Sequence, residues 1–159
     1  MPDRPRKTWV VLADGAHARV LAQDAPGLAL HPALPEDLVE PKARGHGRDI
    51  TTDKPGRTFG MAMGAGGNRG MRAVMEPGHD PKEVEKERFA HRVALLLHEA
   101  ASRHEFDRLI LVAPPKTLGE LRSDLTPATR RLLAGELSKD LVRTPVQDLP
   151  RHLGDLLAA

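Results

Sequence analysis

The sequence predicts an α/β fold, in which helices pack on a mixed β-sheet of about five strands. Two patterns predict it: short apolar runs separated by turn residues open the chain, and strand and helix patterns alternate in its second half. The chain has 159 residues, of which 40% are apolar. This is enough for one domain, residues 1–159, with a buried core.

The first third of the chain is expected to form a small antiparallel meander. Thr8–Ala13 is a β-rich apolar run, and the turn signal Asp14-Gly15 follows it directly. Residues Ala18–Ala22 can return as a second strand, and Gly27–His31 as a short third strand between two prolines. One sheet edge stays open in this arrangement and can pair with a second copy, so the pattern allows a homo-oligomer.

A long helix is expected to begin the second half of the chain. Asp80 can cap it, Pro81 suits its first turn, and Glu83 stands where a capping box needs an acid. The helix should extend to about His104, with apolar residues at helical spacing. This apolar face comprises Val84, Phe89, Val93, Leu96, Leu97 and Ala100.

The remaining elements alternate between strand and helix. Arg108–Ala113 is a continuous apolar run that suits the middle of a sheet, and two prolines end it. Short helices are expected at Thr117–Arg122 and Pro127–Arg131, and Leu132–Leu137 is interpreted as a strand. Capping and proline signals at Thr144–Gln147 open a final helix. Its inward side chains are Leu149, Leu153, Leu156 and Leu157.

The connection between the two halves, at about residues 41–79, has neither helical nor strand periodicity. Its core, residues 42–72, is called the Gly/Arg-rich segment: it holds eight of the fourteen glycines and has seven Lys and Arg against two acids. The net charge of this segment is +5, whereas the whole chain carries +2. Long connections inside a domain are usually functional or disordered, and a localised positive field selects partners. The sequence therefore predicts that this segment is the functional part.

Residues Gly64–Gly70 of this segment form a glycine-rich loop, Gly-Ala-Gly-Gly-Asn-Arg-Gly. It lacks the Gly-Lys-Ser/Thr ending of a P-loop, and no strand leads into it as the dinucleotide fingerprint requires. Exposed backbone amides beside Arg69 and Arg72 can instead follow a phosphate backbone. A disordered linker is the alternative interpretation on composition alone.

No metal and no cofactor is predicted. The chain has no Cys, and its eight His residues are scattered without the spacing of a zinc site. A His and an Asp as close as those in the group His46, Arg48, Asp49, Asp53, Lys54 and Arg57 could make an acid/base pair, but without a fixed scaffold loop polarity and local salt bridges explain the group better. No run of about 18 apolar residues and no signal peptide is present, so we expect a cytoplasmic protein without a membrane partner. With 3% aromatic residues, RNA contacts should be made to phosphate rather than by base stacking.

Several motifs, taken in order, resemble the bacterial host-attachment protein family. Its members are of about this size and are named for a requirement in attachment to host cells. The resemblance covers nearly the whole chain and implies a host-attachment protein; without a signal, an anchor or disulfides, we expect a cytosolic regulator rather than an adhesin. The motifs are Thr8–Ala16, Asp53–Arg57, Phe89-Ala90, Leu109–Pro115, Leu118–Arg122 and Lys139–Leu141.

The order of elements is more distantly similar to the middle domain of archaeal and eukaryotic peptide-chain release factors. There, a Gly-Gly-Gln loop precedes a long helix, a Leu-Ile-Leu strand and a lysine-containing segment. Here, Gly66-Gly67-Asn68 precedes the helix, Leu109–Leu111 and Lys116. In release factors this loop enters the peptidyl-transferase centre, and its Gln positions the hydrolytic water. Asn68 is one methylene shorter, and misplacement by about 1 Å can lower a rate about a hundredfold.

The first hypothesis is a release-factor-like protein of translation that binds ribosomal or transfer RNA through the Gly/Arg-rich segment. The alternative is a cytosolic protein-interaction module that affects host-cell attachment indirectly. The third is a peptidyl-tRNA hydrolase in which Asn68, the catalytic candidate, holds the water. The residue types favour binding over catalysis. The candidate RNA-binding residues are Arg44, Arg48, Lys54, Arg57, Gly66, Gly67, Asn68, Arg69, Arg72 and Lys116.

Overall fold

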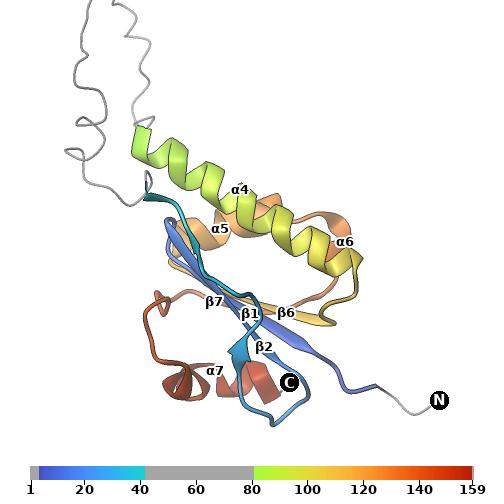
Figure 1. Cartoon of the computed structure of the whole chain (residues 1–159). Helices are drawn as coiled ribbons and strands as arrows, with labels where there is room; N and C mark the ends of the chain where they lie inside the picture. The colour runs from blue at the N-terminus through green and yellow to red at the C-terminus, as the bar shows by residue number, and fades with distance from the viewer. Residues whose placement is uncertain (1–3, 42–80, 159) are drawn as a thin grey trace, which may run out of the picture.

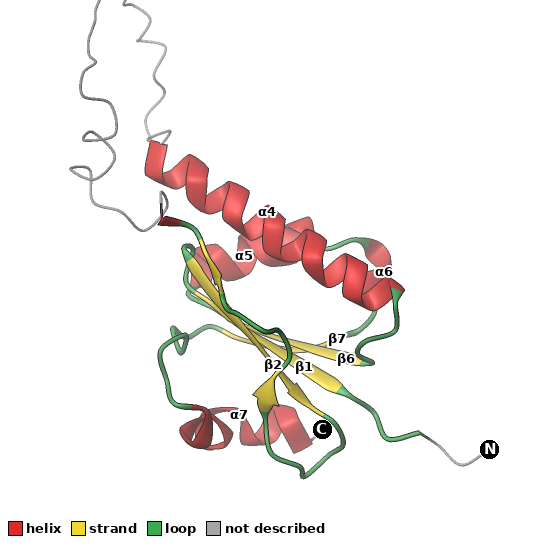
Figure 2. Ribbon diagram, viewed as in Figure 1, coloured by secondary structure: helices red, strands yellow, loops and turns green. Residues whose placement is uncertain are grey.

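A mixed β-sheet with helices on both faces forms the part of the chain that the computed structural model describes, residues 4–41 and 81–158 (Figures 1 and 2). The sheet has six strands in the order β3-β2-β1-β6-β7, and β4 also pairs with β2. The strands are β1 (Thr8–Ala13), β2 (His17–Gln23), β3 (His31–Pro32), β4 (Leu38–Val39), β6 (Arg108–Val112) and β7 (Leu133–Leu137). The helices are α4 (Pro81–Ser102), α5 (Pro115–Asp124), α6 (Pro127–Arg130) and α7 (Leu149–Ala158). The predicted α/β class is confirmed.

Strand β1 lies at the centre of the sheet. It is antiparallel to β2, with Thr8 opposite Gln23, and parallel to β6, with Thr8 opposite Arg108. All six of its residues are buried. Because both faces of the strand are covered, its sequence is a continuous apolar run rather than an alternating one.

One face of the sheet is covered by α4, α5 and α6 (Figure 1). Phe89, Val93 and Leu97 of α4 follow one another at the spacing of a single helical face and are all at most 1% exposed. They pack in one core cluster with alternate residues of β1 and with Leu121 of α5. The predicted buried face is confirmed at these residues and at Ala100, whereas Val84 and Leu96 are only partly buried.

The other face is covered by α7, which packs Leu149, Leu153 and Leu157 on the sheet. The chain reaches α7 through the 3₁₀ turn η2 (Val146–Asp148). Arg19 of β2 fixes this connection, because its guanidinium donates hydrogen bonds to the carbonyl oxygens of residues 142 and 144 at 2.9 and 2.7 Å. The connection to α7 is thereby tied to β2 of the sheet.

Two local predictions were wrong. The expected strand at Gly27–His31 begins only at His31, because Gly27 has a φ of +89° and the Leu28 N–H donates to the Ala25 carbonyl in a turn. The expected cap at Thr144 is absent, since η2 starts after Pro145 without a side-chain cap. Within the described ranges, no helix is both long and apolar enough to cross a membrane.

The packing of α7 generates a stability prediction. Leu153→Ala should lower the free energy of unfolding by about 2–5 kcal/mol, because a fully buried leucine is truncated. Leu95→Ala on α4 is the matched control: Leu95 is 51% exposed, and the change should stay within about 0.5 kcal/mol. Urea denaturation followed by circular dichroism measures both. Equal effects in the two variants would contradict the assignment of Leu153 to the core.

Candidate functional site

The residues predicted to bind RNA fall almost entirely outside the described part of the chain. Lys116, in the first turn of α5, is the one that the structure places. The remaining nine, which include the catalytic candidate, are Arg44, Arg48, Lys54, Arg57, Gly66, Gly67, Asn68, Arg69 and Arg72. The candidate site is therefore built from the described residues that flank this segment.

The two ends of the connection are firmly attached to the folded body. Before it, the Glu40 N–H donates to the Ala16 carbonyl at 2.8 Å, and the Glu40 carboxylate pairs with Arg92 of α4 at 2.9 Å. After it, Pro81 begins α4. Both attachment points lie at the same end of the molecule, away from the N-terminal residues (Figure 1). This end also carries the first turns of α4 and α5.

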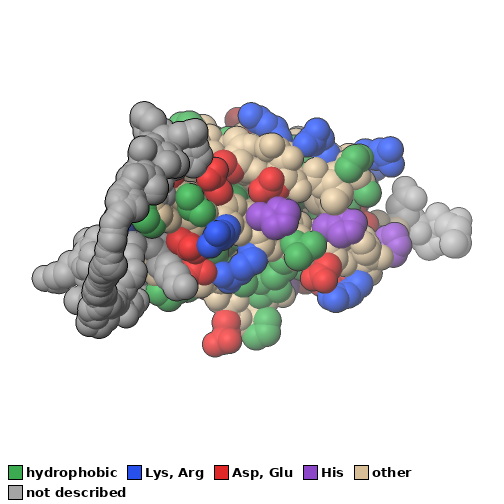
Figure 3. Space-filling model, turned by 90° about the horizontal axis from the view of Figure 1, so that it is seen from above, with side chains coloured by type: hydrophobic (Ala, Val, Ile, Leu, Met, Phe, Trp, Pro, Cys, Tyr) green, Lys and Arg blue, Asp and Glu red, His purple; other side chains and the backbone are tan. Residues whose placement is uncertain are grey.

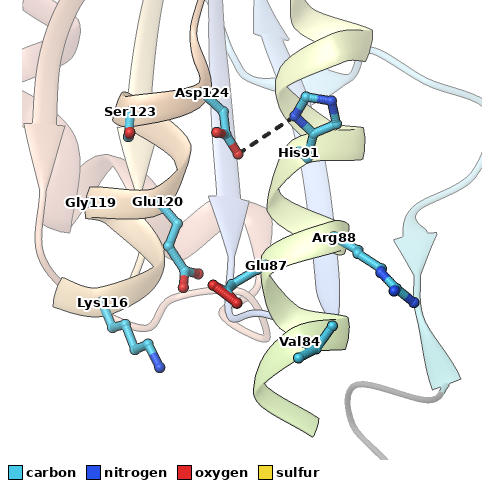
Figure 4. Close-up of a pocket in the computed structure, with 9 residues that line it drawn as sticks. All are labelled: Val84, Glu87, Arg88, His91, Lys116, Gly119, Glu120, Ser123 and Asp124. Carbon is cyan, nitrogen blue, oxygen red and sulfur yellow. Dashed lines mark ion pairs between the residues drawn. The ribbon is translucent and has the colours of Figure 1, made fainter. Parts of the chain in front are cut away.

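A groove of about 740 Å³ runs between α4 and α5 at this end. Acidic, basic and histidine side chains gather on the face that contains it (Figure 3). We call it the α4–α5 groove. It is lined by Val84, Glu87, Arg88 and His91 of α4 and by Lys116, Gly119, Glu120, Ser123 and Asp124 of α5 (Figure 4).

The two cations of the groove already have acidic partners. The Lys116 ammonium forms an ion pair with the Glu83 carboxylate, and the hydrogen bond from Lys116 to Glu83 is the main reason that the lysine pKa is raised. The Arg88 guanidinium lies 3.0 Å from the Glu85 carboxylate on its own helix. Neither cation forms an ion pair with the acids that line the groove itself, although the charge of Lys116 favours the ionised form of Glu120 and so works against the rise of its pKa.

Those acids have few partners. Among the described residues, Glu87 and Glu120 form no ion pair, and their side chains point toward each other across the groove (Figure 4). Burial raises the pKa of Glu120; Lys116 opposes this shift, while the charges of Glu87, Glu83 and Asp124 add to it. Asp124 lies 3.8 Å from the His91 ring nitrogen. The groove is thus a partly enclosed surface with an excess of carboxylate.

This arrangement is suited to binding a cationic group. In the described ranges, no group of three His, Cys, Asp or Glu residues could hold a metal ion. Ser123 is directed away from the His91–Asp124 pair, so the groove does not form a nucleophile with its base (Figure 4). At Lys116, the predicted RNA contact, a phosphate would have to compete with Glu83 for the ammonium.

Glu87, Gly119, Glu120 and Asp124 were not predicted from the sequence as site residues. A signal was present, because Glu83 and Glu87 are four residues apart on one helix and Glu120 and Asp124 are four apart on another, so each pair shares a face. What the sequence could not reveal is that these two faces meet. That depends on how α5 packs against α4.

Comparisons with known proteins identify relatives of the chain. A family model described as "Protein required for attachment to host cells" matches residues 9–153. An uncharacterized protein of Rickettsia prowazekii is 31% identical over 81 residues, which are 50% of this chain and 54% of that protein. The match thus spans about half the length of that relative. None of this bears on the resemblance to the release-factor middle domain, which stays a prediction.

A solved structure of an archaeal protein is similar over 92% of this chain and 32% of its own length. Its TM-score is 0.47 and its sequence identity 12%. At this level of similarity the archaeal protein carries no functional argument, and the groove has to be judged on its own geometry.

Substitution of Gly119 in α5 tests whether the groove is open at this position. Gly119→Ala should stabilise the protein by about 0.5–1 kcal/mol, because alanine favours a helix and no atom lies within 4 Å of the added Cβ. Gly15→Ala should instead destabilise by more than about 1 kcal/mol, since Gly15 has a φ of +101°. Urea denaturation of both variants tests this. A destabilised Gly119→Ala protein would mean that the space above α5 is filled.

The pKa of Glu120 gives a pH dependence with a definite sign. A carboxyl whose folded-state pKa is raised binds its proton more tightly in the folded state, so its contribution to stability is lost as pH rises above the ordinary value of 4.5. In the Glu120→Gln variant, the glutamine side chain has no carboxyl group to titrate. The variant should therefore gain stability relative to the parent between pH 4 and pH 7, as measured by urea unfolding at both values. A relative loss over that interval would contradict the burial of this carboxyl.

Proposed function

We propose that this chain, which belongs to the family of proteins required for attachment to host cells, binds ribosomal or transfer RNA through its Gly/Arg-rich segment. The observation that carries the proposal is the separation of charge along the chain. Seven Lys and Arg fall between residues 42 and 72 against two acids, whereas the rest of the chain is mildly acidic. A concentrated positive field of this kind is the electrostatic footprint of a phosphate-binding surface.

The chemistry of the segment supports phosphate as the main contact. Eight glycines leave backbone N–H groups without side chains to cover them, and arginine matches phosphate geometry with paired donors. Aromatic residues are too few for base stacking to supply the affinity. The proposed RNA contact is therefore electrostatic, with little sequence preference, and strongly dependent on salt.

The folded body supports the proposal by the way it holds the segment. The chain leaves the body beside the Glu40–Arg92 ion pair and returns at the start of α4, which packs on the sheet from Phe89 to Ala100. Both attachments are at one end of the molecule (Figure 1).

A second candidate function, protein binding in the cytoplasm with an indirect effect on attachment, is favoured by a different observation. The α4–α5 groove is acidic, so it suits a protein partner better than a nucleic acid. The two functions use separate surfaces and are compatible in one molecule. The hydrolase hypothesis depends on Asn68, which lies outside the described residues.

Binding to purified ribosomes and to transfer RNA over a salt series tests the RNA proposal. The parent protein should bind at low salt and lose affinity steeply as salt rises. The variant Arg69→Ala/Arg72→Ala should bind more weakly at every salt concentration. If each arginine contacts one phosphate, the slope of log K against log salt should fall by roughly 1.4 to 1.8.

The matched control removes two cations from elsewhere. Lys139 and Arg151 are exposed in the described part of the chain, and Arg151 lies on α7. Lys139→Ala/Arg151→Ala changes the net charge by the same amount and should leave the slope unchanged. The proposal is wrong if the parent does not bind either RNA at low salt, or if the two double variants lose affinity equally.

A further inference from the structure

We infer that the α4–α5 groove docks a basic segment of a protein partner, an extended or helical peptide that carries arginine or lysine side chains. The inference does not depend on RNA binding by residues 42–72. It concerns a surface of described residues at the same end of the molecule, and it rests on the charge balance of the groove, on its unfilled space and on the spacing of its carboxylates.

The charge balance selects a cationic ligand. Glu87, Glu120 and Asp124 line the groove; none of them forms an ion pair with a Lys or Arg of the described residues, and Lys116 acts on Glu120 and Glu87 only through its charge at longer range. The two cations present, Arg88 and Lys116, are held by Glu85 and Glu83. A guanidinium or ammonium group could pair with these carboxylates without breaking an existing ion pair to Lys or Arg. A phosphate would instead be repelled by three acids.

The environment of the Glu120 carboxyl group also favours a cationic ligand. This side chain is half-buried, and burial raises the pKa of its carboxyl group. Its nearest acidic neighbour across the groove, Glu87, disfavours the charged form further. A cation placed between them would offset both effects, because it stabilises the ionised form that burial and repulsion disfavour. The groove therefore gains most from a positively charged occupant.

The shape of the groove leaves room for that occupant. Gly119 stands in the middle of α5, where glycine is a poor helix former, and no atom lies within 4 Å of the Cβ that another residue would place there. Val84, on the facing helix, supplies an apolar wall. A side chain or a stretch of backbone can thus approach α5 closely between Lys116 and Ser123.

The acids on α5 set a spacing that a peptide can match. Glu120 and Asp124 are one turn apart on α5, about 5–6 Å between their Cβ atoms. Cations two residues apart in an extended peptide are separated by about 6.6 Å, and cations four apart in a helix by about 5–6 Å. Either arrangement can present one cation to Asp124 and a second to the Glu87–Glu120 pair.

Fluorescence anisotropy with a labelled peptide of alternating arginine and alanine tests the inference on the full chain at low salt. The parent should bind it and should not bind a peptide in which glutamate replaces arginine. Glu120→Gln/Asp124→Asn should weaken binding at least tenfold, and Gly119→Leu should do the same by filling the groove. Urea denaturation confirms that both variants stay folded.

The matched control is Glu99→Gln/Asp155→Asn, which removes the same two charges from exposed positions on α4 and α7. It should change the dissociation constant less than twofold. Equal weakening in both double variants, or no binding by the parent, would overturn the inference.

The same assay reveals other occupants, each of which would also overturn it. If the parent does not bind the peptide but the variant Arg69→Ala/Arg72→Ala does, the chain's own Gly/Arg-rich segment competes for the groove. If transfer RNA displaces the peptide and Glu120→Gln/Asp124→Asn weakens the RNA itself, the groove is part of the nucleic-acid surface. If Gly119→Leu converts a dimer to a monomer in sedimentation, a second copy fills it. Failure of the RNA proposal alone would leave peptide binding intact.

Discussion

The burial of β1 on both of its faces is the constraint on which the rest of the structure depends. A central strand that is apolar throughout needs a layer on each side, and the chain supplies α4 with α5 on one face and α7 on the other. The parallel pairing of β1 with β6 requires a crossover, and α4 is that crossover. The start of α4 is therefore fixed relative to the sheet, and so is the surface that α4 forms with α5.

The fold was predictable where one pattern of side chains decided the element. The continuous apolar run at Thr8–Ala13 and the helical spacing through Phe89 and Leu97 each matched the structure, because burial enforces such periods. Prediction failed where a single backbone angle or hydrogen bond decided the outcome. The turn at Gly27 and the uncapped start of η2 are cases of this kind, and β4, two residues long, has too few residues to show a period.

The candidate functional residues also differ in how far the sequence could predict them. A run of positive charge is a property of the sequence itself, so the Gly/Arg-rich segment was identified without a structure. The α4–α5 groove was not, because its acids come from helices about thirty residues apart and meet only through packing on the shared sheet. One end of the molecule thus joins a basic segment to an acidic groove. A basic segment and an acidic groove favour ligands of opposite charge.

The proposed RNA contacts lie mainly in the Gly/Arg-rich segment, residues 42–72. Photo-crosslinking of the full chain to transfer RNA that contains 4-thiouridine, followed by mass spectrometry of the crosslinked peptides, tests this most directly. If RNA binds through the Gly/Arg-rich segment, most crosslinked peptides should derive from residues 42–72. Crosslinks concentrated on α7 or on the acidic groove, or no crosslinks at low salt, would contradict it.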